Sequence, residues 1–267
     1  IRPISSARRG SGKSCGAERM ATAVIGNAHA KVIRHAPNSK ATNPIDVRAF
    51  YFVRSDWQTA TTGPDGQGPL RLSWSPPHEE DEGFVLQGYD DLVLSAGGWW
   101  AAHHIFEIGR HPLSWVALTG WGHEAGRAPA SVRLVSAAVF QATVEAWVRD
   151  QAIIRLTRHL LDVTASRIFL QPWPAPNRSI KSDPEWALNR WYGEQAPEAW
   201  RVFFLAQRAA LQAIAAEFGP RLVLLDYPLA EVFEDGYMDG SLCNPDPFHA
   251  NAAYGALVVD QIAAHMG

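Results

Sequence analysis

An aspartate and a histidine near the C-terminus have the types and the spacing needed for acid–base chemistry. Asp246 and His249 are the first and last residues of the tetrapeptide DPFH. A carboxylate three positions before an imidazole can hydrogen-bond one ring nitrogen, which fixes the tautomer and leaves the other nitrogen to face a reacting group. The pair therefore supplies the base and the orienting acid of a nucleophilic hydrolase. Taken alone, the pattern also fits a solvated turn that contains an ordinary histidine.

The place where the nucleophile is expected holds an alanine. The apolar run Ala21–Gly26 is predicted to be the first strand, and Asn27 and Ala28 follow it. Nucleophilic catalysis needs a hydroxyl or a thiol, and the methyl group of Ala28 provides neither. Cys243 is close in sequence to His249, but it is not favoured as a replacement because attack is expected to start from the turn after the first strand.

The elements that must position these residues follow an alternating pattern. Helical periodicity covers residues 130–165 and Trp200–Phe218, and the second helix is predicted to stop at Gly219. The region Thr61–Gly88 is rich in glycine, proline and acidic residues and is predicted to be a surface loop. Strands that alternate with helices are typical of α/β proteins with a parallel, doubly wound sheet. The predicted strands are short apolar segments closed by turn residues: Ala21–Gly26, Ile45–Val53, Asp91–Ser95, Arg167–Gln171 and Arg221–Leu225.

A sheet of this kind also predicts where the reactive side chains lie. Ligands of open α/β sheets bind beyond the carboxyl ends of the strands. The loops that start at Gly26, Ser95, Pro172 and Asp226 are therefore expected to share one edge of the sheet. We expect the turn that holds His249 to lie at the same edge.

The two terminal blocks, and the βα units between them, make the chain resemble the SGNH/GDSL hydrolase superfamily. Members of that superfamily have a Gly-Asp-Ser or Gly-Asn-Ser block after the first strand and a D-x-x-H block near the C-terminus. Here Gly26 and Asn27 match the first block, and Asp246 and His249 match the last. Ala28 stands at the position of the nucleophilic serine. The resemblance implies a flavodoxin-like three-layer sandwich with a mainly parallel five-stranded sheet.

The resemblance also implies a division of the chain and a meaning for Ala28. Residues 20–267 are expected to form the hydrolase domain, and residues 1–19, which are rich in Ser, Gly and Arg, an N-terminal extension that is disordered or introduced by cloning. Ala28 is then either an introduced replacement of the serine or the natural residue, and the intact Asp–His pair favours the first reading. In both cases the pocket is expected to persist.

The donors that would stabilise an oxyanion are less specific in the sequence. The resemblance implies the backbone N–H at position 28, a glycine after the second strand and an asparagine after the third. After the third predicted strand, however, the chain has Trp99 where an asparagine is expected. The candidates for the second donor are the backbone of Gly98 and the imidazoles of His103 and His104. The second and third donors therefore stay open.

The segment from Trp99 to His123 holds the densest group of tryptophans and histidines in the chain. It is predicted to be either a wall of the substrate pocket or an irregular loop that packs on the domain. Its spacing is loosely compatible with a metal site, but no H-E-x-x-H arrangement and no cluster of Cys or carboxylates accompanies it, so no metal is expected. Trp173 follows the fourth predicted strand, and stacking on its ring could hold an aromatic or sugar-like substrate.

Bulk properties exclude several classes of partner. A net charge of −3 over 267 residues lacks the basic surface that nucleic-acid binding requires. Two cysteines far apart in sequence indicate neither a disulfide framework nor a zinc site. No apolar run approaches the roughly 20 residues that cross a bilayer. We therefore expect no nucleic-acid or membrane partner and a cytoplasmic location.

These features together predict a carboxylic-ester hydrolase with a Ser/His/Asp acyl-enzyme mechanism and no cofactor. The expected partner is a small-molecule ester with an aromatic, acyl or sugar part, and the chain as written is expected to bind it without turnover because of Ala28. Two alternatives remain: an acyltransferase on the same fold, or a natural non-catalytic ligand-binding protein. The substrate and the oligomeric state stay open.

Overall fold

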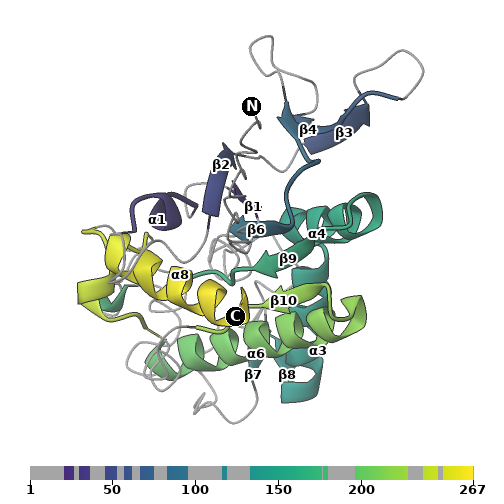
Figure 1. The fold of residues 1–267 in the computed structure, drawn as a ribbon. Helices are drawn as coiled ribbons and strands as arrows, with labels where there is room; N and C mark the ends of the chain where they lie inside the picture. The colour runs from purple at the N-terminus through teal and green to yellow at the C-terminus, as the bar shows by residue number, and fades with distance from the viewer. Residues whose placement is uncertain are drawn as a thin grey trace, which may run out of the picture.

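The computed structural model describes residues 21–26, 30–36, 46–52, 57–61, 67–74, 83–95, 116–118, 133–175, 177–179, 196–227, 237–245 and 249–266. Its central feature is a parallel sheet with the strand order β10-β9-β6-β1-β2 (Figure 1). All neighbouring pairs in this sheet are parallel. The predicted α/β architecture with a parallel sheet is thus confirmed. The strands are β1 (Ala21–Gly26), β2 (Asp46–Phe52), β6 (Asp91–Ser95), β9 (Arg167–Leu170) and β10 (Leu222–Leu224).

Alternate residues of these strands face two separate apolar clusters. Ile25, Leu94 and the residues two positions before each of them pack on one side of the sheet. Val24 and Val93 pack on the other side. The first side, named here the α4 face, is covered by α3 (Ala137–Arg149), α4 (Ala152–Val163) and α6 (Ala196–Phe218). The second side, the α8 face, is covered by α1 (Ala30–Arg34) and α8 (Ala252–Met266). Strands covered on both faces read as continuous apolar runs, which explains why the sequence predicted them.

The helical stretch predicted over residues 130–165 is interrupted. Its first part is a short strand, β8 (Arg133–Val135), and two helices follow, with Asp150 and Gln151 between them. The hydroxyl of Ser136 accepts a hydrogen bond from the backbone N–H of Val139 at 3.3 Å, so it caps α3. The later helix α6 ends where predicted, before Gly219, whose φ is +73°.

The prediction of a surface loop over Thr61–Gly88 is wrong. Strands β3 (Trp57–Thr61), β4 (Leu70–Trp74) and β5 (Phe84–Val85) form a small antiparallel sheet. Leu72 at its centre is fully buried in the cluster of the α4 face, which outweighs the polar composition of the segment. A further strand, β7 (Val116–Leu118), lies inside the Trp99–His123 segment and pairs with β8.

Among the described residues, no helix combines the length and the apolar character needed to cross a lipid bilayer.

Candidate functional site

The ends of β1 and β6 meet where the strand order of the parallel sheet reverses. Gly26 pairs with Ser95 across these two strands. A Cβ atom at position 26 would lie 2.1 Å from the carbonyl oxygen of Ser95 and 3.0 Å from the Cβ of Ala30. Only glycine therefore allows the chain to leave β1 at this point. Because ligands bind at such reversal points, the carboxyl end of β1 at Gly26 forms the first part of the candidate site.

Three polar side chains are buried on the α8 face. Ser95 and Gln171 follow Val93 and Phe169 by two positions on neighbouring strands, so their side chains point to the same face. Ser95, Gln171 and Tyr254 are 2%, 4% and 1% exposed. Among the described residues, the hydroxyl groups of Ser95 and Tyr254 and the carboxamide of Gln171 have no hydrogen-bond partner of standard geometry. The carboxamide of Gln171 nevertheless faces the phenol of Tyr254. Groups of this kind commonly bind water or serve a function.

Electrostatics keep the buried phenol neutral. Burial raises the pKa of Tyr254, and the nearby carboxamide of Gln171 opposes the shift only in part. Burial likewise raises the pKa of Tyr227, which follows β10 on the same face. Both phenols therefore remain protonated donors at neutral pH.

The loop before α8 holds His249 between hydrogen bonds. The backbone N–H of Asn244 donates to the carbonyl of His249 at 2.8 Å, and the backbone N–H of Asn251 donates to the carbonyl of Leu242 at 2.8 Å. An isolated antiparallel bridge joins the two arms of the loop between these bonds. Leu242 ends the short 3₁₀ helix η4 (Gly240–Leu242). The backbone of His249 is therefore fixed, and its side chain is half-buried.

The side chain of Asn251 fastens this loop to α8. Its Oδ1 accepts hydrogen bonds from the backbone N–H groups of Ala253 at 2.9 Å and Tyr254 at 3.3 Å. Its Nδ2 donates to the carbonyls of Ser241 at 2.8 Å and Cys243 at 3.1 Å. Asn251 therefore caps α8.

Helices α1 and α8 lie side by side, as Figure 1 shows, and a glycine sets their distance. A Cβ atom at Gly255 would lie 1.9 Å from the carbonyl oxygen of Val32. The backbone of α8 therefore rests directly on α1. The segment after the first strand and the segment after His249, more than 200 residues apart in sequence, are held together by this contact.

A surface cavity of about 390 Å³ lies between these two segments. Of the residues predicted for the site, His249 is in its wall, and Gly26 ends the strand that leads into α1. The described residues that line the cavity are Lys31 and Val32 of α1 and His35 just after it, together with Asn244, His249, Ala250, Asn251 and Ala252. The predicted site residues Asn27, Ala28, Gly98, Trp99, His103, His104 and Asp246 lie outside the described residues.

Trp173 is placed differently from its predicted role. Its side chain is 3% exposed and belongs to the apolar cluster of the α4 face. Its ring packs on that of Trp147 in α3, with 5.6 Å between the ring centroids. A ring enclosed in this way offers no face to a substrate, so Trp173 serves packing.

Near the cavity, the described residues include one buried cysteine and no group of side chains suited to a metal ion. Cys243 is buried, and its Sγ donates to the carbonyl of Asp239 at 3.3 Å. A thiol in this setting behaves as a small apolar side chain. Within the described ranges, no group of three or more His, Cys, Asp or Glu side chains could hold a metal ion.

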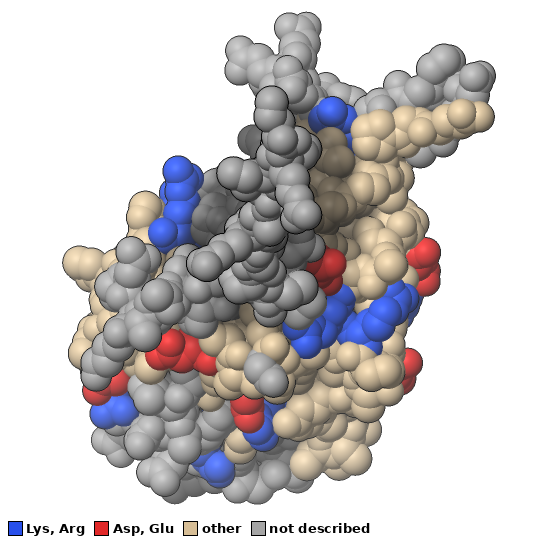
Figure 2. Space-filling view, viewed as in Figure 1, with Lys and Arg blue, Asp and Glu red and all other residues tan. Residues whose placement is uncertain are grey.

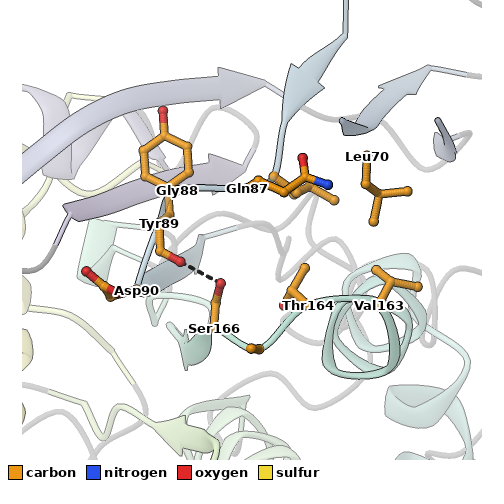
Figure 3. Close-up of a pocket in the computed structure, with 10 residues that line it drawn as sticks. Leu70, Gln87, Gly88, Tyr89, Asp90, Val163, Thr164 and Ser166 are labelled. Atoms are coloured by element: carbon orange, nitrogen blue, oxygen red, sulfur yellow. Dashed lines mark hydrogen bonds between the residues drawn. The ribbon is translucent and has the colours of Figure 1, made fainter. Parts of the chain in front are cut away.

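A second cavity, of about 330 Å³, opens at the opposite edge of the sheet (Figure 3). It lies beside the residues that precede β6 and β9, where the hydroxyl of Ser166 donates to the carbonyl of Tyr89 at 2.7 Å. Leu70 and Gln87 stand across it from Val163 and Thr164 in Figure 3. Because this is the amino edge of the strands, it is not where an α/β sheet binds its reactive ligand.

Charged side chains on the surface are mixed in sign. On the face drawn in Figure 2, the described basic and acidic residues are interspersed. Arg149 joins Glu145 of α3 to Glu217 of α6, with N–O distances of 2.7 and 2.5 Å. These pairs tie helices of the α4 face together at the surface and lie away from the cavity beside His249.

The sequence did not single out Lys31, His35 or Gln171. Lys31 and His35 look like ordinary solvated positions of a helix, and only the docking of α8 on α1 turns them into a cavity wall. Gln171 follows an apolar strand, and this polar residue was the one signal in the sequence that pointed to it. The structure adds that its side chain is buried.

No protein-family model matches the chain, and no curated protein matches it. The function is therefore inferred from the residues and the geometry of the site.

Proposed function

We propose that the chain is a carboxylic-ester hydrolase of the SGNH type whose nucleophile position, Ala28, carries no hydroxyl. The observation that carries this proposal is the cavity that His249 shares with Lys31, the third residue after position 28. One wall of the cavity thus starts three residues after the nucleophile position. His249 of the D-x-x-H block and the helix that follows the first strand line the same cavity, which is the proximity that a serine hydrolase needs.

The strand order supports a flavodoxin-like sandwich for this hydrolase. Numbered in sequence order, the parallel strands run 2-1-3-4-5 across the sheet. This is the doubly wound order of flavodoxin-like folds, in which the ligand lies at the reversal between the first and third strands. Gly26 and Ser95 end those two strands.

In the active form, a serine at position 28 would attack the ester carbonyl. His249 would take the serine proton and pass it to the leaving alcohol, and Asp246 would orient the imidazole. The backbone N–H at position 28 would donate to the oxyanion. Water would then release the acyl group from the serine, and no cofactor is required. An acyltransferase would use the same steps with an alcohol in place of water.

The restoring substitution Ala28→Ser tests this proposal. Loss of a catalytic serine costs on the order of a million-fold in turnover in a serine protease, so Ala28→Ser should raise the hydrolysis of p-nitrophenyl esters by several orders of magnitude. His249→Ala in the restored chain should abolish this gain. His265→Ala, which removes another imidazole at the far end of α8, should keep it.

A second candidate function is favoured by Ala28 itself, which leaves the chain without a nucleophile. In that case the protein would be a ligand-binding protein on the same fold. Failure of Ala28→Ser to hydrolyse a broad panel of esters, in a folded protein, would exclude the esterase and favour the binding protein.

A further inference from the structure

The titratable side chains among the described residues that line the cavity beside His249 are one lysine and two histidines. Lys31 is an exposed residue of α1, His35 is an exposed residue just after the end of α1, and His249 belongs to the opposite wall. The described lining residues include no aspartate or glutamate. The chain as a whole carries a net charge of −3, so a cavity whose described lining carries Lys31 and no carboxylate is a local departure. A concave surface of one sign concentrates ligands of the opposite charge.

The other polar side chains of the cavity are already engaged. Nδ2 of Asn244 donates to the carbonyl of Ala250 at 3.0 Å. Asn251 uses both ends of its carboxamide, as a donor to two backbone carbonyls and as the cap of α8. The backbone N–H groups of Ala253 and Tyr254 in α8 are therefore occupied as well. Among the described side chains of the lining, the ammonium group of Lys31 and the imidazole of His35 are further donors for a ligand.

The proposed mechanism determines which part of a substrate meets these donors. His249 would pass its proton to the leaving alcohol, so the alcohol part of the ester must lie beside His249. Lys31 and His35 follow position 28 by three and seven residues. Lys31 lies in the first turn of α1, and both side chains line the same cavity as His249. A charge on an alcohol part held in this cavity would reach them.

We propose that this cavity recognises an anionic alcohol part, so that the preferred substrates are esters of a hydroxy acid. The inference rests on the esterase function proposed above and names its substrate class. A carboxylate held by Lys31 and His35 would orient the alcohol oxygen toward His249. Salt should weaken this preference, because the two basic side chains are exposed and screening acts fully on them.

A matched pair of esters tests the inference in the Ala28→Ser protein. The probes are 4-acetoxyphenylacetate, which is anionic, and its methyl ester, which is neutral and has a similar leaving group. We expect a higher kcat/KM for the anionic ester, and Lys31→Gln should lower the ratio of the two kcat/KM values about two- to fivefold. Arg155→Gln, which removes a positive charge from α4 on the other face, should keep the ratio.

A binding measurement separates this inference from the esterase proposal. The chain with Ala28 is titrated with 4-hydroxyphenylacetate and with its methyl ester, followed by calorimetry. Stronger binding of the acid that is lost with Lys31→Gln supports the anion site, even if Ala28→Ser hydrolyses nothing and the esterase proposal fails. Hydrolysis of both esters with a ratio that Lys31→Gln does not change overturns the anion site and leaves the esterase proposal standing. Equal binding of acid and ester overturns it too.

Discussion

The α4 face and the α8 face of the same sheet are built in different ways. On the α4 face, long helices bury large apolar side chains such as Ile154 and Leu160, which are fully inaccessible. On the α8 face, two glycines allow backbones to touch, and Gln171 lies buried beside Tyr254. The first arrangement gains stability from buried apolar area. In the second arrangement, a shift of α8 would displace His249 directly.

Because of this difference, we expect the stability of the fold and the position of the site residues to depend on different parts of the molecule. We expect substitutions on the α4 face to lower the free energy of unfolding while the activity of each folded molecule persists. Substitutions on the α8 face should cost less stability and more activity. Activity here means the kcat/KM of the Ala28→Ser protein for an ester.

The largest loss of stability is expected from Ile154→Ala on the α4 face. Ile154 is 0% exposed, and truncation of such a residue costs about 2–5 kcal/mol because it leaves a cavity. Urea unfolding measures the loss, and Val139→Ala is the control because Val139 is 51% exposed. The kcat/KM of the folded fraction should stay unchanged. A drop in kcat/KM with Ile154→Ala would show that the two faces are not separable.

Gly255→Ala tests the close contact on the α8 face. The new methyl group would lie 1.9 Å from the carbonyl oxygen of Val32, so α8 must move away at a cost of about 1–3 kcal/mol. We expect kcat/KM to fall further than the loss of stability explains. Gly240→Ala is the matched control, since a Cβ atom there meets nothing within 4 Å. Equal effects of the two alanines on kcat/KM would contradict a positioning role for the α1–α8 contact.

Asn251→Ala removes the link between the His249 loop and α8. Loss of the cap alone costs about 0.5–2 kcal/mol, and the Nδ2 bonds to Ser241 and Cys243 are lost with it. Asn251→Asp separates the two parts, because the carboxylate still accepts from Ala253 but cannot donate. Thermal unfolding should place Asn251→Asp between the wild type and Asn251→Ala. If Asn251→Asp is as unstable as Asn251→Ala, the donor side matters more than the cap.

The sequence predicted the parallel sheet because its strands are covered on both faces and so read as unbroken apolar runs. It missed the small antiparallel sheet because β5 has only two residues and the pairing of β4 with β3 and β5 depends on distant contacts. At the site, Gly26 and His249 were found from local motifs. The cavity wall formed by Lys31 depends on the docking of α8, which no local pattern encodes.

The smallest effect is expected where α6 is fastened to the α8 face. Arg208 of α6 pairs with Asp226, and the next residue, Tyr227, packs on Phe204 at 4.3 Å between centroids. The hydrogen bonds from Arg208 lower the pKa of Asp226 below its ordinary value of 3.8, and burial opposes this only in part. A lowered pKa means that the stabilisation is present above pH 3.8 and is lost as the pH falls through the folded-state value.

Asp226→Asn should therefore flatten the acid side of the stability profile. Both side chains of the pair are substantially exposed, 31% for Arg208 and 51% for Asp226, so solvent screening limits the effect to less than about 1 kcal/mol. Urea unfolding at pH 3 and at pH 6 measures it, and 1 M salt should reduce the difference between the wild type and Asp226→Asn. An acid limb that is as steep in Asp226→Asn as in the wild type would show that the Arg208–Asp226 pair does not contribute to the pH dependence of stability.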